Sequence, residues 1–356
     1  MKEWIDCRNL LVIRADNMGD LLLSSPAIEA LKQTFKCKIT VLTSSKAQSV
    51  VRVLPVIDEV IVCDVPWVKH EHGDDPATFL QLLSQIKAAS FDGCVVFTVY
   101  SQNPMPAILL AYLAEIPLRL AYCRENPYHL LSHWVPDKEP YHHIKHQVIR
   151  DLDLVATIGA IVKPQPLKLK VSAAASIHLA EKLFALGLSQ VPQSYFILHP
   201  GVSEEKRRYP KKLWIALAQK LMHTYHKPLF ITGAAADEKV SAEIAAGAGE
   251  GCISVAGQFE LGEFATLIGE AIAVVSVNTS TVHLAAAMQT PVVVLHAETN
   301  PQHSPWMVPH QVLSFSVPEP LKSKNQVLHW VDEKLYKIHI PYPEAEEILE
   351  ALNTIT

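Results

Sequence analysis

Residues 10–31, LLVIRADNMGDLLLSSPAIEAL, contain the pattern that decides the fold. The apolar run at 10–13 predicts a buried strand, and the Ser-Pro pair at 25–26 predicts the start of a helix. In the polar turn between them, Gly19 permits backbone conformations that other residues resist. The turn therefore places the next side chain, Asp20, at the carboxyl edge of a parallel sheet, where α/β proteins bind their ligands. Asp20 is a candidate catalytic residue, and the alternative is that it only complements the helix dipole.

Two segments in the second half of the chain repeat this strand-turn-helix pattern. The apolar residues 196–198 are followed by the turn His-Pro-Gly-Val-Ser at 199–203 and by the basic run Lys-Arg-Arg at 206–208. The apolar residues 273–277 are followed by the turn Asn-Thr-Ser-Thr at 278–281. Small-residue turns expose backbone amides, and hydroxyl groups and cations beside them suit a bound phosphate. Both turns are therefore expected to bind an anion.

Composition and spacing favour a two-domain α/β protein. The chain has 356 residues, of which 49% are hydrophobic, which is enough for two cores. Short β-branched runs alternate with helical patterns, as is typical of a doubly wound sheet. The Lys-Pro-Gln-Pro segment at 163–166 blocks helix and sheet alike, so it is the expected linker. The net charge of -5 gives no indication of nucleic-acid binding.

The cysteines and the apolar segments indicate a cytoplasmic protein. The six cysteines show no CxxC spacing and are expected to be reduced thiols, with no metal site. Charged residues interrupt the N-terminal segment, so no signal peptide is expected. No uninterrupted apolar stretch approaches the roughly 20 residues that a membrane span needs.

Taken together, the motifs resemble those of glycosyltransferase family 9, the ADP-heptose:lipopolysaccharide heptosyltransferases. The resemblance covers nearly the whole chain. It rests on the order and spacing of MGD at 18–20, SSPA at 24–27, HPG at 199–201, RYP at 208–210, NT at 278–279, HLAAA at 283–287 and TNP at 299–301.

The resemblance implies the GT-B fold, an α/β architecture of two Rossmann-like doubly wound domains facing across a cleft. We expect an acceptor-binding domain at residues 1–164 and a nucleotide-sugar-binding domain at residues 165–340. A terminal helix within residues 341–356 is expected to pack back across the domains. The resemblance also leaves room for peripheral contact with the cytoplasmic face of the inner membrane.

The resemblance further implies an inverting glycosyltransferase. It would move a sugar, heptose before others, from an ADP-linked or other nucleotide-diphosphate donor to a hydroxyl of a lipopolysaccharide-core, other glycan or lipid-linked acceptor. Such a transfer needs one base for the acceptor hydroxyl and a clamp for the leaving diphosphate. Asp20 is the expected base. Arg119 and Arg124 are candidate acceptor contacts, with ordinary surface arginines as the alternative. The expected donor-binding residues are Gly19, Gly201, Ser203, Arg207, Arg208, Asp237, Glu238, Asn278, Thr279, Ser280 and His283.

The expected roles differ within the donor-binding set. Arg207, together with the amides and hydroxyls of the two turns, would neutralise the diphosphate. No cofactor and no obligatory metal is therefore expected. Asp237 or Glu238 would bind ribose hydroxyls, as a carboxylate does in dinucleotide-binding folds, or would simply begin an exposed helix.

The sequence departs from the family pattern at four places. Asn278 stands where the family usually has an aspartate, Ser280 replaces a glycine, Ala297-Glu298 replaces Gly-Pro, and Arg207 replaces a lysine. An asparagine can hydrogen-bond to a sugar, but it cannot stabilise positive charge at the anomeric carbon as a carboxylate does. The departures therefore concern the donor, and they leave the expected base in place.

Three alternatives stay open. A noncatalytic sugar-nucleotide-binding protein on the same fold would keep the diphosphate turn but would tolerate loss of Asp20, which is present here. A glycosyltransferase with a different donor and a small-molecule acceptor would share the motifs. An NAD-dependent oxidoreductase is disfavoured, because the first turn lacks the GxGxxG sequence of dinucleotide-binding folds.

Overall fold

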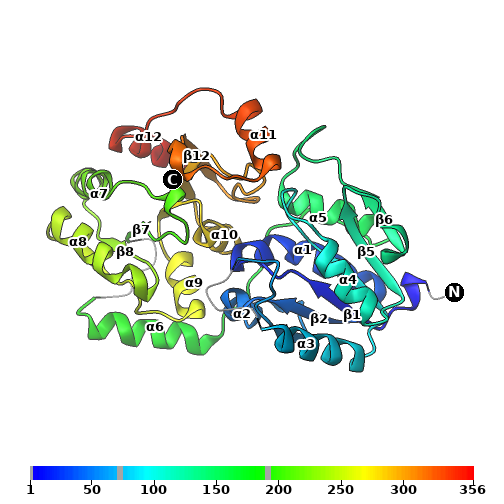
Figure 1. Ribbon diagram of the computed structural model, residues 1–356. Coiled ribbons are helices and arrows are strands. Elements are labelled where there is room, and N and C mark those ends of the chain that lie inside the picture. Colours follow the sequence, from blue (N-terminus) through cyan, green and yellow to red (C-terminus); the bar gives the residue numbers. More distant parts are fainter. Residues whose placement is uncertain (1–2, 70–74, 189–193) are drawn as a thin grey trace. The chain divides into compact units, whose positions relative to one another are not determined.

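The computed structural model describes residues 3–69, 75–188 and 194–356. The chain divides into two compact units, Met1–Gln165 and Pro166–Thr356, each built on a six-stranded sheet (Figure 1). Helices connect most successive strands in both units, and every neighbouring pair of strands is parallel. The doubly wound α/β organisation expected from the sequence is therefore confirmed.

The sheet of the first unit has the strand order β3-β2-β1-β4-β5-β6. Its strands are β1 (Asn9–Ile13), β2 (Lys38–Thr43), β3 (Glu59–Val62), β4 (Gly93–Val96), β5 (Leu118–Cys123) and β6 (His133–Pro136). In the register of the sheet, Val12 of β1 lies opposite Val41 of β2 and Val95 of β4. The order reverses between β1 and β4, and open α/β sheets bind ligands outside the carboxyl ends of the strands at such a switch point.

The helices of the first unit pack on a sheet whose central strand is buried. They are α1 (Met18–Phe35), α2 (Gln48–Val51), α3 (Pro76–Ala88), α4 (Met105–Leu113) and α5 (Gln147–Ala156). Leu82 and Ile86 of α3 and Ile108 of α4 join one hydrophobic cluster with Leu11 and Ile13 of β1. Helix α1 packs against α5. These contacts hold β1 rigidly at the centre of the unit.

Helix α1 begins earlier than the sequence pattern predicts. The prediction placed its start at the Ser-Pro pair, whereas the helix begins at Met18 and contains Pro26 in its interior. The prediction was wrong because it overlooked the cap. Asn17 precedes the helix, and its backbone N–H donates to the Asp20 carboxylate at 3.3 Å. A carboxylate that satisfies a free backbone N–H at a helix start favours that start.

The second unit repeats the same strand order. Its sheet runs β12-β11-β10-β7-β8-β9. Its strands are β7 (Phe196–His199), β8 (Leu229–Ile231), β9 (Cys252–Ser254), β10 (Ala273–Val277), β11 (Val292–Ala297) and β12 (His310–Phe315). The order reverses between β7 and β10, which places a second switch point beyond His199 and Val277. Both anion-binding turns expected from the sequence follow these two strands.

The helices of the second unit include the terminal one. They are α6 (Ala173–Ala185), α7 (Lys211–Tyr225), α8 (Glu238–Ala248), α9 (Leu261–Gly269), α10 (Ser280–Ala287), α11 (Gln326–Leu335) and α12 (Ala345–Ile355). Helix α12 contacts α7, β11 and β12. Its residues Ile348 and Leu352 are fully buried in the hydrophobic core of this unit. The terminal helix is therefore part of the core of the second unit.

Ile348→Ala is expected to destabilise the second unit by about 2–5 kcal/mol, because the truncation leaves a cavity in a packed core. Chemical denaturation followed by tryptophan fluorescence measures the loss. Glu350→Ala changes an exposed position on the same helix and serves as the control. Equal stability of the two variants would show that α12 contributes little to this core.

Candidate functional site

At the switch point of the first unit, a buried arginine holds two carboxylates. Arg14 directly follows β1, and its side chain is fully buried. Its Nη2 donates to Oδ1 of Asp20 at 3.2 Å, and its Nη1 lies 3.3 Å from Oδ2 of Asp16. Asp16 and Asp20 are 6% and 8% exposed. The expected base is thus held by a guanidinium that a second carboxylate shares.

The backbone of this turn is fixed from the neighbouring strand. The hydroxyl of Thr43 donates to the carbonyl of Arg14 at 2.8 Å, and the hydroxyl of Ser44 donates to the carbonyl of Asp16. The N–H of Arg14 donates to the carbonyl of Leu42 at 3.0 Å. These bonds explain why a polar turn keeps one conformation and holds Asp20 at the edge of the sheet.

Burial and charge act against each other in this cluster. Burial raises the pKa of Asp16 to about 6, although Arg14 opposes the rise, and Asp20 adds to it. Burial also disfavours the charge on Arg14, but Asp16, Asp20 and Asp151 outweigh that effect, so the pKa of Arg14 is raised. Arg14 therefore stays charged, while Asp16 takes up a proton at mildly acidic pH.

Asp16 also lines a small pocket beside the carboxyl ends of β1, β2 and β3. The pocket is lined by Ala15, Asp16, Asn17, Ser44, Lys46, Asp64, Val65, Val68 and Lys69. Its charged lining residues are two lysines and two aspartates, and it has room for no more than a water molecule.

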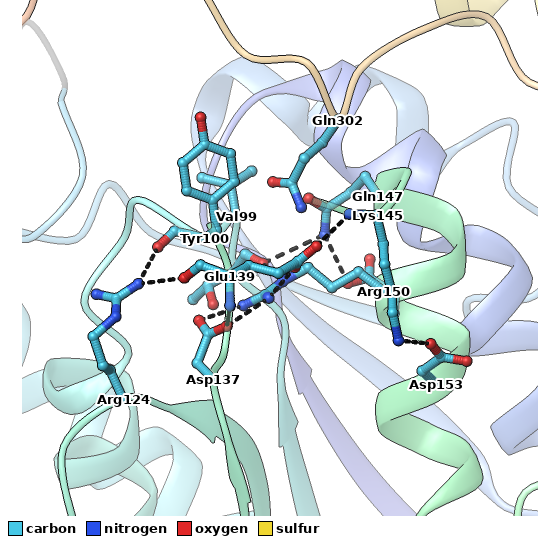
Figure 2. A network of polar contacts seen from close by, with 12 residues as sticks. Val99, Tyr100, Arg124, Asp137, Glu139, Lys145, Gln147, Arg150, Asp153 and Gln302 are labelled. Atoms are coloured by element: carbon cyan, nitrogen blue, oxygen red, sulfur yellow. Dashed lines mark hydrogen bonds and ion pairs between the residues drawn. The ribbon is translucent and has the colours of Figure 1, made fainter. Parts of the chain in front are cut away.

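A second buried arginine organises the other strand ends of this unit (Figure 2). Arg150 of α5 donates to both carboxylate oxygens of Asp137, at 2.9 and 2.8 Å, and also to Glu139. Its Nε donates to the carbonyl of Thr98 at 3.1 Å. Asp137 and Glu139 follow β6, and Thr98 follows β4, so Arg150 ties two strand ends to one helix. The network makes this edge of the sheet rigid.

The two candidate acceptor arginines lie at opposite edges of the sheet. Arg119 lies near the amino end of β5, where its guanidinium donates to the carbonyls of Leu130 at 2.7 Å and His129 at 3.0 Å. Arg124 follows the carboxyl end of β5 and donates to the carbonyls of Tyr100 and Glu139 (Figure 2). Because ligands bind at the carboxyl edge, this placement speaks against Arg119 as an acceptor contact and keeps Arg124 as a candidate.

In the second unit, the structure brings the turn after β7 together with the loop after β8. A Cβ added to Gly201 would lie 2.5 Å from Oδ2 of Asp237. A Cβ added to Gly233 would lie 2.7 Å from the Cβ of Asp237. Asp237 also accepts a hydrogen bond from the N–H of Ala234 at 2.9 Å. Glycine is therefore required at 201 and 233 for this close approach. Glu238, the neighbouring candidate, is exposed and lies against Gly257.

Arg207 connects the first turn to the second. It lies in a short 3₁₀ helix, Glu205–Arg207, and its Nη1 donates to the carbonyl of Asn278 at 3.1 Å. Its Nη2 lies 3.1 Å from the carboxylate of Glu204. Its Nε is buried without a hydrogen-bond partner in the part of the chain that the structure describes. Arg208, in contrast, pairs with Glu205 at 2.7 Å, and Ser203 is exposed.

The side chain of Asn278 is engaged with the end of β11. Its Nδ2 donates to Oγ1 of Thr299 at 2.9 Å and to the carbonyl of Ala297 at 3.4 Å, and its Oδ1 accepts from the N–H of Ala297 at 3.3 Å. Thr279 occupies the N-cap position of α10 without a side-chain capping hydrogen bond, and Ser280 is the first residue of the helix. The start of α10 thus lies directly beside the Arg207 guanidinium.

Three histidines surround this edge of the second unit. His283, in the first turn of α10, is buried, and its ring meets that of His303 edge-on at 5.9 Å. His199 ends β7 and lies 2.9 Å from the hydroxyl of Thr232. His296 of β11 is buried, and burial lowers the pKa of both His199 and His296 to about 4. These two rings are neutral at physiological pH.

Sequence reasoning missed three residues of the two sites. They are Arg14, Asp16 and His296. A signal for the first two was present, since a charged residue directly after a fully apolar strand must lie near the buried edge of the sheet. His296 carries a weaker form of the same signal, since a histidine directly follows the apolar run 292–295.

Neither a metal site nor a membrane span emerges from the described residues. Within residues 3–69, 75–188 and 194–356, no group of three or more His, Cys, Asp and Glu side chains is arranged to hold a metal ion. None of the helices in these same ranges is both long and apolar enough to cross a membrane.

Two Rossmann-like units, each with polar residues at its switch point, define an α/β protein of the GT-B class. The family model described as "Glycosyltransferase family 9 (heptosyltransferase)" matches residues 80–329. The chain belongs to glycosyltransferase family 9 and is a glycosyltransferase.

Individual relatives agree with this assignment. Lipooligosaccharide heptosyltransferase 2 of Haemophilus influenzae is 24% identical over 341 residues, which cover 93% of this chain and 91% of the relative. A family 9 glycosyltransferase structure from Veillonella parvula has a TM-score of 0.77 at 16% identity. The match covers 100% of this chain and 98% of the Veillonella chain. The structure of Escherichia coli ADP-heptose LPS heptosyltransferase II has a TM-score of 0.71 at 22% identity and covers 98% of each chain. The likeness confirms the GT-B fold.

Asp16→Asn is expected to stabilise the first unit at pH 8, by on the order of 1–3 kcal/mol, and to have little effect near pH 4. The pKa of Asp16 is raised from 3.8 to about 6 in the folded protein. The stability that protonation of Asp16 provides is therefore complete below about pH 4 and is lost as the pH rises through about 6. The side-chain amide of the Asp16→Asn variant does not titrate, so this contribution stays constant. Thermal unfolding of both proteins between pH 4.5 and 8 measures the difference, and a difference independent of pH would contradict the prediction.

Proposed function

We propose that this protein is an inverting glycosyltransferase that transfers heptose from ADP-heptose to a hydroxyl of a lipopolysaccharide-core acceptor. The observation that carries the proposal is Asp20, a buried carboxylate held by Arg14 at the switch point of the first unit. The names of two relatives support the substrates, since one is a lipooligosaccharide heptosyltransferase and the other an ADP-heptose LPS heptosyltransferase.

In the proposed reaction, Asp20 acts on the acceptor. The acceptor oxygen forms a bond to the anomeric carbon while the bond from that carbon to the diphosphate oxygen breaks. The hydroxyl proton passes to the Asp20 carboxylate, and the electron pair of the broken bond leaves with the nucleotide diphosphate. Arg14 contributes by donating a hydrogen bond to one oxygen of Asp20, which fixes the orientation of the carboxylate.

In the same proposal, the second unit holds the donor. Arg207 lies between the turn after β7 and the start of α10, where its charge and the helix amides can neutralise a diphosphate. Asp237 packs against Gly201 and is the proposed ribose contact, because it follows the second strand of a Rossmann-like unit. These groups supply the charge that a metal would otherwise provide, so we propose a reaction without an obligatory metal.

One observation favours a second candidate, a family 9 enzyme with a different sugar donor. The side-chain amide of Asn278 bonds to Thr299 and Ala297 and offers no carboxylate to the sugar. Thermal-shift measurements with ADP-, GDP-, UDP- and dTDP-sugars separate the candidates, because a donor that binds the folded state raises the melting temperature. The acceptor is proposed to be carried on a lipid, which would bring the enzyme to the inner membrane peripherally.

Asp20→Asn is expected to lower kcat by about 10²–10⁴, because the amide cannot accept the hydroxyl proton. The dissociation constant for ADP should stay nearly unchanged, since the proposed clamp lies in the other unit. The assay measures ADP release from ADP-heptose with de-O-acylated lipopolysaccharide core, with and without EDTA. Glu29→Gln, the same chemical change on the outer part of α1, is the control. Wild-type turnover of Asp20→Asn would make Asp20 a purely structural cap, and loss of wild-type activity in EDTA would reject the metal-free proposal.

Arg207→Ala is expected to lower kcat as well as donor affinity, because its charge stabilises the leaving diphosphate more than the intact donor. Arg207→Lys should recover part of both, since it keeps the charge but loses the fork of donors. Lys212→Ala removes an exposed cation at the start of α7 and is the matched control. Steady-state kinetics over a range of donor concentrations measure the effects. Kinetics equal to those of the control would remove Arg207 from the clamp.

A further inference from the structure

Asp16 and Asp20 depend on a single cation. Nη1 of Arg14 faces Asp16 at 3.3 Å, and Nη2 faces Asp20 at 3.2 Å. All three side chains are nearly or fully buried, so solvent screens their charges weakly. Two carboxylates that share one guanidinium cannot each receive its full stabilisation. The ionisation of one must therefore change the proton affinity of the other.

Asp16 is held in this position independently of Asp20. The side-chain amide of Gln102 donates to Oδ1 of Asp16, and Gln102 is itself fixed by the N–H of Val99, which donates to its Oε1 at 3.1 Å. Asp16 also lines the small pocket described above, whereas Asp20 is in the first turn of α1. Asp16 thus lies in the turn and Asp20 in α1, and both side chains contact Arg14.

The other charged groups near this pair belong to several elements. Lys46 lies in the turn after β2, and Asp64 and Lys69 follow β3, all lining the same pocket as Asp16. Asp151 and Arg150 of α5 act on Arg14 with opposite signs. Asp20 and Arg14 are the charged groups that act most directly on Asp16. Asp16 can therefore influence the proposed base through the shared guanidinium and through the direct repulsion between the two carboxylates.

We propose that Asp16 sets the proton affinity of Asp20 through the guanidinium that they share, and that Asp16 is a positioning residue for the proposed reaction. The inference rests on the proposed function of Asp20 as the base. When Asp16 is ionised, its negative charge offsets part of the effect of Arg14, so the pKa of Asp20 is higher and Asp20 is the stronger base. When Asp16 is neutral, the charge of Arg14 acts on Asp20 without this offset and makes it a weaker base.

The first test is the pH dependence of kcat. Because Asp16 takes up its proton near pH 6, kcat of the wild type should fall as the pH drops through that value. Asp16→Asn should lack this step and should have a lower kcat than the wild type at pH 8. Asp64→Asn leaves Asp16 and Arg14 in place and should keep the step. ADP affinity, measured by calorimetry, should stay unchanged in both. An Asp16→Asn profile that is lower than that of the wild type but keeps the step near pH 6 would show a merely structural role and overturn the proposal.

The second test needs no substrate. At pH 8, the rise in melting temperature caused by Asp16→Asn should be smaller in the Asp20→Asn background, where Arg14 is already free to serve Asp16. Additive effects of the two substitutions would overturn the shared-guanidinium inference. Asp16→Ser, a second neutral variant, gives the same comparison if the asparagine variant folds poorly.

The two tests also separate this inference from the proposed function. If Asp20→Asn keeps wild-type turnover, the proposed function fails, whatever the melting temperatures show. If Asp20→Asn is inactive while Asp16→Asn keeps the step in kcat near pH 6 and the melting effects are additive, only the role of Asp16 fails. Coupled melting effects together with loss of that step support both.

Discussion

The burial of the Arg14 guanidinium constrains the first unit more than any other interaction. A buried charge must be paired, because removing it from water without a partner is strongly unfavourable. Arg14 meets this requirement with Asp16 in the turn and Asp20 in α1. The same pairing fixes the conformation of the turn, the start of the helix and the direction of the proposed base. A single electrostatic requirement thus couples the fold of this segment to its chemistry.

The two units use one topology with different chemistry at the switch point. In the first unit the charges are buried and mutually paired, as for Arg14 and Arg150. In the second unit the cation of Arg207 is half-buried, bonds to a backbone carbonyl and pairs with Glu204, and its Nε keeps donor capacity for a ligand. Buried pairs hold a group in one position, whereas a partly exposed cation beside helix amides suits an anion that binds and leaves. This contrast matches a base in one unit and a leaving-group site in the other.

Much of the fold followed from local patterns. The apolar run at 10–13 lies within β1, and the runs at 196–198 and 273–277 lie within β7 and β10. Patterns of this kind are local and strong, since parallel strands are buried on both faces. The predicted start of α1 was wrong because it relied on the Ser-Pro pair. The helix begins earlier in the chain, where the Asp20 carboxylate accepts a hydrogen bond from the N–H of Asn17. Four departures from the family pattern were visible in the sequence, but the bonding of Asn278 to Ala297 and Thr299 was not.

The sequence by itself determined the family, the two-domain α/β class and the candidate base Asp20, because these depend on motifs and on residues that are close in the chain. The tertiary structure decided which candidates share an edge. Arg119 and Arg124 come from one strand, and only the strand direction separates them. Asp237 meets Gly201 because β7 and β8 pair in parallel and their loops therefore emerge at the same edge. Such meetings depend on strand order and register, which are set by long-range packing and are not encoded in any short stretch of residues.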